Sequence, residues 1–303
     1  MLDKFFIRLY RKLYYTVKKI LNTIYYIPKL NDNLLLINSW TEQWFGNLSH
    51  RNFGDELNNY LLEELTDYKV VNALNTFLSG KKYLVIGSII EEYSSTGCVV
   101  WGSGTIEGFP RKLKCIPSKI TAVRGKLTRS YLINNGIECP EVYGDPALLL
   151  PLVYKPNVQK KSKYGLIPHV VDLNNPLIST FINHYKDQVC LISFRDYDDW
   201  HNVINQICSC DAIISSSLHG LIISDAYAIP NVWITVSDKI EGGLYKFKDY
   251  FSGVDRNFSM PYQLNLKTTL IDIDNELDKY KAIDVDLKAL LNACPFKLRK
   301  NFL

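Results

Sequence analysis

Short hydrophobic runs alternate with amphipathic stretches over most of the chain. Runs of strand length, bounded by polar or glycine-containing segments, predict buried β-strands, and hydrophobic positions that recur every three or four residues predict helices. The predicted strands are residues 34–37, 83–86, 99–101, 120–123, 141–143, 164–167, 189–192, 212–214 and 232–236; the predicted helices are residues 55–65, 126–134, 176–185, 200–207 and 217–228. This alternation is typical of parallel sheets with helices on both faces.

A break in the pattern divides the chain into two α/β halves. Residues 151–163 contain two prolines and four lysines but little periodicity, which is typical of a connection. We therefore expect an N-terminal helix at 1–27, a first α/β domain at 28–152, a linker at 153–163, and a second α/β domain with C-terminal helices at 164–303. Ligands of such folds bind at the carboxyl ends of the strands, here in the cleft between the domains.

The first 26 residues mix basic and apolar side chains and predict a basic amphipathic helix. No apolar stretch is long enough to cross a bilayer and no cleavage site follows, so neither a transmembrane helix nor a signal peptide is expected. Two interpretations stay open. The helix lies on an anionic membrane surface, or it packs on the domain or on a partner.

The composition is that of a folded globular protein, with 47% hydrophobic and 22% charged residues among 303. The net charge of +4 permits an anionic substrate or surface. No tract of alternating basic and aromatic residues predicts nucleic-acid binding. The seven cysteines lack the spacing of zinc sites, so we expect reduced thiols, a cytoplasmic protein and no metal.

A histidine near the start of a predicted helix is the first candidate for chemistry. An apolar strand at 212–214 leads to Ser217 and Leu218 at the helix start, and His219 follows in the first turn. Free N–H groups and the positive end of the helix dipole favour a phosphate or carboxylate there. A histidine beside them can bind the anion or move a proton, whereas the alternative is a surface or capping histidine.

Three further cations are expected at the same cleft. Arg124 ends a predicted strand, where a guanidinium can clamp a phosphate or carboxylate with two hydrogen bonds. His169 follows a strand of the second half, and Lys246 lies in a downstream segment that could close on an anion. Together with His219 they form a basic constellation from both halves, which suits a small, doubly charged substrate.

Other residues at strand ends have two possible roles each. Asp55 either caps the helix that follows it or contacts substrate, and Asp145 either caps a turn or contacts a sugar hydroxyl. Gly104 ends a Gly-Ser-Gly loop that lets a ligand approach the backbone closely. The spacing of that loop does not match the dinucleotide-binding fingerprint.

Several of these motifs, in this order, resemble the polysaccharide pyruvyltransferase family. They are Asn-Phe-Gly-Asp at 52–55, Val-Trp-Gly-Ser-Gly at 100–104, Ala-Val-Arg-Gly at 122–125, Tyr-Gly-Asp-Pro-Ala-Leu-Leu-Leu-Pro at 143–151, Ile-Pro-His at 167–169 and Ser-Ser-Leu-His-Gly at 216–220. The resemblance covers residues from about 34 to 252, and the helix at 10–24 lies outside the family pattern. It is closest to enzymes that install pyruvate ketals on bacterial exopolysaccharide or capsule repeat units.

The resemblance implies an α/β fold of two Rossmann-like domains, like that of GT-B glycosyltransferases, with the active site in the interdomain cleft. It implies phosphoenolpyruvate as donor and co-substrate, a sugar diol as acceptor, and no other cofactor. The residues expected to bind phosphoenolpyruvate are Arg124, Ser217, Leu218, His219 and Lys246, and the acceptor-side candidates are Asp55, Gly104, Asp145 and His169.

His219 is expected to be the general acid that protonates the methylene carbon of the donor, beside Arg124. Asp55, Asp145 and His169 all stay open as the base toward the sugar. The basic N-terminus favours a polyprenyl-diphosphate-linked oligosaccharide as acceptor, used at the inner face of the cell membrane by a peripheral cytoplasmic enzyme. A GT-B glycosyltransferase that uses a nucleotide sugar is the alternative, and a non-catalytic membrane-surface scaffold of a polysaccharide assembly complex is a third interpretation.

Overall fold

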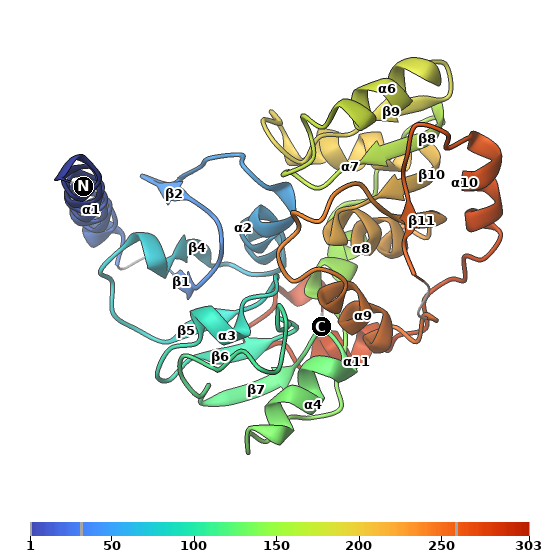
Figure 1. Ribbon diagram of the computed structural model, residues 1–303. Helices are drawn as coiled ribbons and strands as arrows, with labels where there is room; N and C mark the ends of the chain where they lie inside the picture. Colours follow the sequence, from blue (N-terminus) through green and yellow to red (C-terminus); the bar gives the residue numbers. More distant parts are fainter. Residues whose placement is uncertain (1, 31–32, 258–259, 303) are drawn as a thin grey trace.

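The structure, a computed structural model, describes residues 2–30, 33–257 and 260–302. The described chain has a mixed α/β fold with two five-stranded parallel sheets, one in each half (Figure 1). The expectation of alternating strands and helices that build parallel sheets is therefore confirmed. The more specific GT-B architecture stays a prediction.

The first sheet has the order β4-β1-β5-β6-β7. Its strands are β1 (Leu34–Ile37), β4 (Lys69–Asn72), β5 (Lys82–Leu84), β6 (Val99–Trp101) and β7 (Lys119–Ala122). The helices of this half are α2 (Phe53–Leu65), α3 (Ile90–Tyr93), α4 (Lys126–Asn134) and α5 (Leu150–Val153), with 3₁₀ turns at Ala73–Asn75 and Pro146–Leu149. A two-stranded hairpin, β2 (Gln43–Trp44) and β3 (Asn47–Leu48), stands beside the sheet.

The second sheet has the order β12-β11-β10-β8-β9. Its strands are β8 (Ser162–Ile167), β9 (Val189–Leu191), β10 (Cys210–Ser215), β11 (Asn231–Thr235) and β12 (Tyr262–Gln263). The helices that follow its strands are α6 (Pro176–His184), α7 (Trp200–Cys208), α8 (Leu218–Ala226), α9 (Tyr245–Gly253), α10 (Leu270–Leu277) and α11 (Leu287–Asn292). The strands at its centre are almost entirely buried, as expected for a parallel sheet covered on both faces.

Two predictions of local structure were wrong. The helix predicted at 55–65 begins at Phe53 with Asn52 in the N-cap position, so Asp55 lies in the first turn and is not the cap. Residues 141–143 make only a single bridge, between Val123 and Tyr143, and form no strand. The first difference arises because a capping residue sets a helix end only to within one or two residues, and the second because a single bridged residue does not make a strand.

The two halves share one hydrophobic core. The ring of Phe53, at the start of α2, lies 5.2 Å from the ring of Phe194 in the second half. The Phe53 N–H donates to the Phe194 carbonyl at 2.8 Å, and the Asp196 N–H donates to the His50 carbonyl at 2.8 Å. These contacts place the N-terminal end of α2 against the loop that follows β9.

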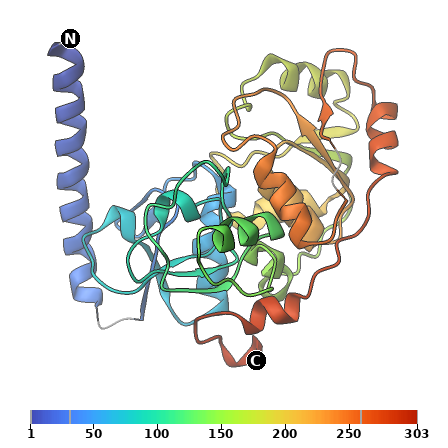
Figure 2. The ribbon, with the colours of Figure 1, turned by 60° about the horizontal axis from the view of Figure 1, so that its bottom comes forward.

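The C-terminal segment crosses back to the first half (Figure 2). The Trp101 indole N–H donates to the Leu290 carbonyl at 2.9 Å, and Tyr83 and Phe296 pack with ring centroids 4.6 Å apart. A bridge between Thr66 and Leu298 and a final 3₁₀ turn at Lys300–Phe302 complete this return.

Helix α1 (Leu2–Tyr26) projects from the first half, and its C-terminal part, from Tyr15 onward, contacts that half (Figure 2). A short 3₁₀ turn at Ile27–Lys29 follows it. Asn22 is buried and fixes this end, because its side chain donates to the Asn75 carbonyl at 2.9 Å and accepts from the Phe45 N–H at 2.7 Å. Among the helices of the described chain, none is long and apolar enough to cross a membrane.

Candidate functional site

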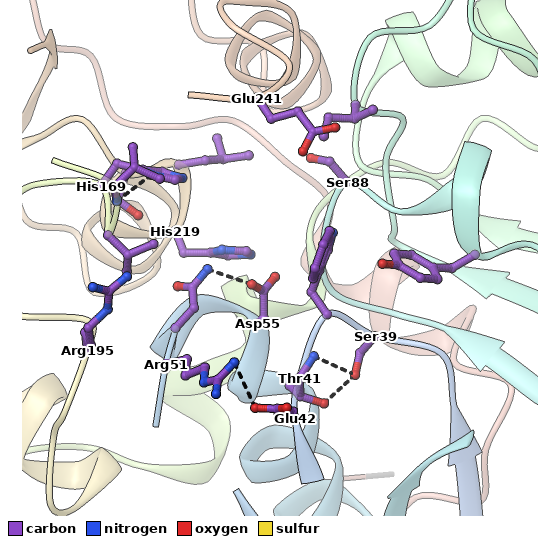
Figure 3. Close-up of a pocket in the computed structure, with 18 of the residues that line it drawn as sticks. Ser39, Thr41, Glu42, Arg51, Asp55, Ser88, His169, Arg195, His219 and Glu241 are labelled. Atoms are coloured by element: carbon purple, nitrogen blue, oxygen red, sulfur yellow. Dashed lines mark hydrogen bonds and ion pairs between the residues drawn. The ribbon is translucent and has the colours of Figure 1, made fainter. Parts of the chain in front are cut away.

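A cavity of about 690 Å³ opens between the two halves, at the carboxyl ends of the central strands. Side chains from both halves line it. Six of the nine residues proposed from the sequence are among them, namely Asp55, His169, Ser217, Leu218, His219 and Lys246, and the other three, Arg124, Gly104 and Asp145, lie outside the lining. In Figure 3, His219 and Asp55 lie at the centre, with His169 and Arg195 on one side and Ser39 and Thr41 on the other.

His219 lies in the first turn of α8, directly after the central strand β10. The N-cap residue is Ser217, and in this fully described segment its side chain makes no capping hydrogen bond. The N–H groups of the first turn therefore lack this hydrogen-bond acceptor at the end of the helix that faces the cavity. The helix dipole adds positive potential there. The helix start lies where the sequence predicts it, and anion binding there stays a prediction.

The imidazole of His219 packs between Gly54 and Asp145. An ideal Cβ on Gly54 would lie 2.2 Å from Nδ1 of His219, so a side chain there would displace the ring. On the other side, Nε2 lies 3.8 Å from Oδ2 of Asp145. Within the described chain, both of these buried atoms are without a hydrogen-bond partner.

The electrostatics of this pair hold the imidazole neutral. Burial, together with the positive charges of Arg124 and Lys246, lowers the pKa of His219 to about 3. Burial also raises the pKa of Asp145 to about 7. Asp145 additionally caps the turn Pro146–Leu149, where its Oδ1 accepts from the Ala147 N–H at 3.0 Å, so the capping role considered for it is present.

Lys246 reaches the cavity from the first turn of α9 and is only 9% exposed. Burial and the neighbouring Arg124 lower its pKa to about 8, while the Asp55 carboxylate opposes that shift. Asp55 accepts a hydrogen bond from the Asn52 side chain at 2.6 Å, and burial raises the pKa of Asp55 to about 6. The cavity therefore holds an amine and a carboxyl group that both titrate closer to neutral pH than usual.

Arg124 is buried behind the cavity, and each of its three guanidinium nitrogens donates a hydrogen bond to a neighbouring group. Its Nε donates to Asp249 at 2.9 Å and its Nη2 donates to the Thr105 carbonyl at 2.7 Å. Its Nη1 donates to the Ser88 hydroxyl, and Ser88 does line the cavity. Arg124 thus supplies positive charge from behind the wall and orients Ser88, and whether it clamps a substrate stays a prediction.

Gly104 leaves room for the guanidinium of Arg124. An ideal Cβ at Gly104 would lie 2.3 Å from Cζ of Arg124, so the group that approaches this glycine closely is the guanidinium. His169, by contrast, lines the cavity just after β8. Its backbone N–H donates to the Ser216 hydroxyl at 2.9 Å. Burial and the charges of Lys246 and Arg195 lower the pKa of His169 to about 3.

Several lining residues were not proposed from the sequence. They are Trp40 and Tyr93, Ser88, and the basic residues Arg51, Arg195 and Lys239. Trp40 and Arg195 each follow a strand that the sequence predicts, at 34–37 and 189–192, so the rule that ligands lie at the carboxyl ends of strands could have found them. Among the described residues, no group of three or more His, Cys, Asp or Glu side chains is arranged to hold a metal ion.

Comparisons with known proteins identify the family of this chain. A family model described as polysaccharide pyruvyl transferase matches residues 4–238. The match begins within α1, so the expectation that this helix lies outside the family pattern was wrong. The match ends before Lys246. One relative, from Acanthamoeba polyphaga mimivirus and named "Uncharacterized protein L143", is 30% identical over 248 residues, which cover 80% of this chain and 84% of the relative. The chain belongs to the polysaccharide pyruvyl transferase family.

Proposed function

We propose that this protein transfers the pyruvyl group of phosphoenolpyruvate to two hydroxyl groups of one sugar in a polysaccharide repeat unit, forming a cyclic ketal. The observation that carries the proposal is the position of His219. It lies in the first turn of α8, faces a cavity that also holds Lys246, and belongs to a chain of the pyruvyl transferase family. The repeat unit that the sequence resemblance implies is that of a bacterial exopolysaccharide or capsule.

The second half supplies the donor site. Phosphoenolpyruvate carries a phosphate and a carboxylate, and the N–H groups at Ser217–His219 together with Lys246 offer complementary charge. Arg124 adds positive charge from behind Ser88. The pKa of His219 is low because the ring is buried and lies near cations. An anionic donor would therefore raise that pKa and let the imidazole carry a proton.

The reaction balances without an oxidant or reductant. His219 gives a proton to the methylene carbon, which becomes a methyl group, and the adjacent carbon becomes electrophilic. One sugar hydroxyl adds to that carbon, the carbon–oxygen bond to phosphate breaks, and the neighbouring hydroxyl closes the ring. The two hydroxyls lose two protons, of which one restores His219 and the other is taken up by a base and passes to the departing phosphate. We therefore propose phosphoenolpyruvate as the co-substrate, with no cofactor.

Asp55 is our choice of base toward the sugar. It lines the cavity, whereas the buried Asp145 lies behind His219. The pKa of Asp55, about 6, lets this carboxylate accept a proton near neutral pH. His169 also lines the cavity, but its pKa of about 3 makes it the weaker base.

Helix α1 supports a lipid-linked acceptor at a membrane surface. Apolar side chains on one face point away from the body and are exposed, namely Leu9, Leu13, Val17, Ile20 and Ile24. The opposite face turns inward near the C-terminal end, where the ammonium group of Lys18 lies 4.3 Å from the centre of the Trp44 ring. An outward apolar face flanked by basic residues suits an in-plane helix on anionic lipid. We propose a peripheral enzyme at the inner face of the cell membrane, acting on a polyprenyl-diphosphate-linked oligosaccharide.

Phosphate release from phosphoenolpyruvate in the presence of a lipid-linked oligosaccharide tests the function. We expect wild-type protein to release phosphate and add one pyruvate ketal to the acceptor, as measured by mass spectrometry and NMR. His219→Gln should slow release by about a hundredfold or more, which is typical of the loss of a general acid. His184→Gln, an exposed histidine of α6, is the matched control. Turnover of nucleotide sugars instead of phosphoenolpyruvate would show a glycosyltransferase.

A further inference from the structure

Trp40 stands exposed in the cavity on a rigid turn. It follows β1, and 54% of its surface is accessible, although the residues on either side of it, Ser39 and Thr41, are buried. The two hydroxyls of these neighbours are hydrogen-bonded at 2.6 Å. The Asn72 side chain donates to the Ser39 carbonyl at 3.1 Å and to the Thr41 carbonyl at 2.6 Å. The turn is therefore held from both sides, and the indole is the part presented to the cavity.

The indole has an open aromatic face. Tyr93 packs against it with ring centroids 5.8 Å apart and an angle of 81° between the rings, so the two rings are not stacked on each other. A half-exposed tryptophan on a fixed turn keeps a large apolar surface in water, which is unfavourable unless a ligand covers it.

Charge is divided between the two sides of the cavity. The lining residues Arg195, Lys239 and Lys246 come from the second half, whose lining carboxylate Glu241 is paired with Arg111 at 3.2 Å. The first half lines its side with the carboxylates Glu42 and Asp55, with hydroxyl groups, and with Arg51, which is paired with Glu42 at 2.9 Å. A dianionic donor is therefore attracted to the second half, and a neutral, hydroxyl-rich ligand suits the first half.

We propose that Trp40 is the stacking platform for the pyranose ring of the acceptor, and this inference rests on the proposed function. One face of a pyranose carries only C–H groups, whose partial positive charge complements the negative face of an indole ring. The ring hydroxyls then lie at the edge of the sugar, within the part of the cavity that Asp55 and Ser39 line. Stacking on Trp40 holds the diol beside the candidate base.

Sugar binding without donor tests the inference directly. The probes are the methyl glycosides of galactose, glucose, mannose and N-acetylglucosamine, and the readout is saturation-transfer NMR from the protein to the sugar C–H protons. We expect at least one glycoside to receive saturation on one face of its ring. Trp40→Ala should weaken that binding about tenfold, the cost of losing an aromatic stack, while Trp40→Phe should keep most of it. Phe109→Leu, an exposed aromatic outside the cavity lining, is the control.

Donor binding gives the second measurement. Trp40→Ala should leave the affinity for phosphoenolpyruvate within about twofold of wild type, because the donor lies on the opposite side of the cavity. Three results would overturn the inference: no glycoside binds the wild type, Trp40→Ala binds glycosides as the wild type does, or Trp40→Ala weakens phosphoenolpyruvate as strongly as sugar. If the wild type binds sugar on Trp40 but does not turn over phosphoenolpyruvate, that result would count against the proposed function alone.

Discussion

The imidazole of His219 is positioned by two neighbouring residues, one on each side of the ring. Gly54 leaves room for the ring on one face, and Asp145 lies 3.8 Å from Nε2 on the other. A general acid must be held in one orientation to deliver its proton, so both neighbours are positioning residues for His219. Each supports a specific prediction.

Gly54→Ala should displace His219. The new methyl group would meet the imidazole at 2.2 Å, so we expect kcat for phosphate release to fall at least about tenfold. Gly54 lies in the first turn of α2, where alanine is otherwise the better helix former by roughly 1 kcal/mol. In a His219→Gly background both the imidazole and the Cβ of residue 219, which would lie 2.8 Å from the new methyl group, are removed. There, Gly54→Ala should raise the free energy of unfolding in urea, and a loss of stability in that background would contradict the explanation.

Asp145→Asn should make stability less dependent on pH. Burial raises the pKa of Asp145 from 3.8 to about 7, so the folded state binds more protons than the unfolded state between these values. Stability from this group therefore falls as pH rises through that window. The amide keeps the cap but carries no charge, so the variant should gain about 2 kcal/mol over wild type at about pH 8 relative to about pH 5, as measured by urea unfolding. An equal gain at both pH values would disprove the assignment.

Helix α1 shows how a sequence pattern acquires direction only in the structure. Amphipathic spacing predicts the helix, but not which face it turns to the body. Asn22 and Tyr26 are buried at its C-terminal end, and this contact turns Leu13 and Ile20 outward. The side chain of Tyr15 also lines the cavity, so α1 adjoins the site as well as the solvent.

The outward face of α1 should control membrane binding. Leu13→Ser combined with Ile20→Ser should reduce sedimentation with phosphatidylglycerol-containing vesicles by about tenfold or more, because two large apolar side chains no longer enter the lipid. The matched control is Ile116→Ser with Leu266→Ser, two exposed apolar residues on the body. Transfer to a water-soluble acceptor should not change. Unaltered vesicle binding, together with loss of a dimer in gel filtration, would assign this face to a second copy of the chain.

At the scale of the whole molecule, the two halves behave as one packed unit around the cavity. The Phe53 and Phe194 rings meet in the shared core, and the buried Arg124–Asp249 pair crosses between the halves at 2.9 Å. Because Asp249 also accepts from the Thr128 N–H and hydroxyl, it holds the start of α4 against α9. Opening of the cavity is therefore opposed by buried polar contacts as well as by apolar ones.

Asp249→Asn should destabilise the whole molecule. The substitution leaves the Arg124 charge buried without its counter-ion, which costs about 3 kcal/mol or more. The control is Asp255→Asn, which removes the exposed Lys126–Asp255 pair between the same two halves and should cost less than about 1 kcal/mol. Both variants should unfold in one cooperative transition in calorimetry. Two separated transitions in the wild type would show that the halves fold independently.

Much of the fold and part of the site could be predicted because they depend on local pattern. The buried strand β6 is a continuous apolar run, β10 has an apolar centre at 212–214, and α4 has the predicted bounds. Strand β4 was missed because its polar ends, Lys69 and Asn72, hide a short apolar centre. His219 and its helix start could be found because a strand, a serine cap and a helical period lie next to one another in sequence.

The sequence by itself determined the class of fold, the helix start that carries His219, and the motifs of the family, since each depends on residues close together along the chain. Only the tertiary structure decided that Arg124 lies behind Ser88, that Asp55 faces the cavity while Asp145 lies behind His219, and that Trp40 is exposed. Those outcomes depend on burial and on partners far away in sequence, such as Asp249 for Arg124. A pattern of residue types does not specify which partner a long polar side chain reaches, because that choice is made by the packing of the two halves.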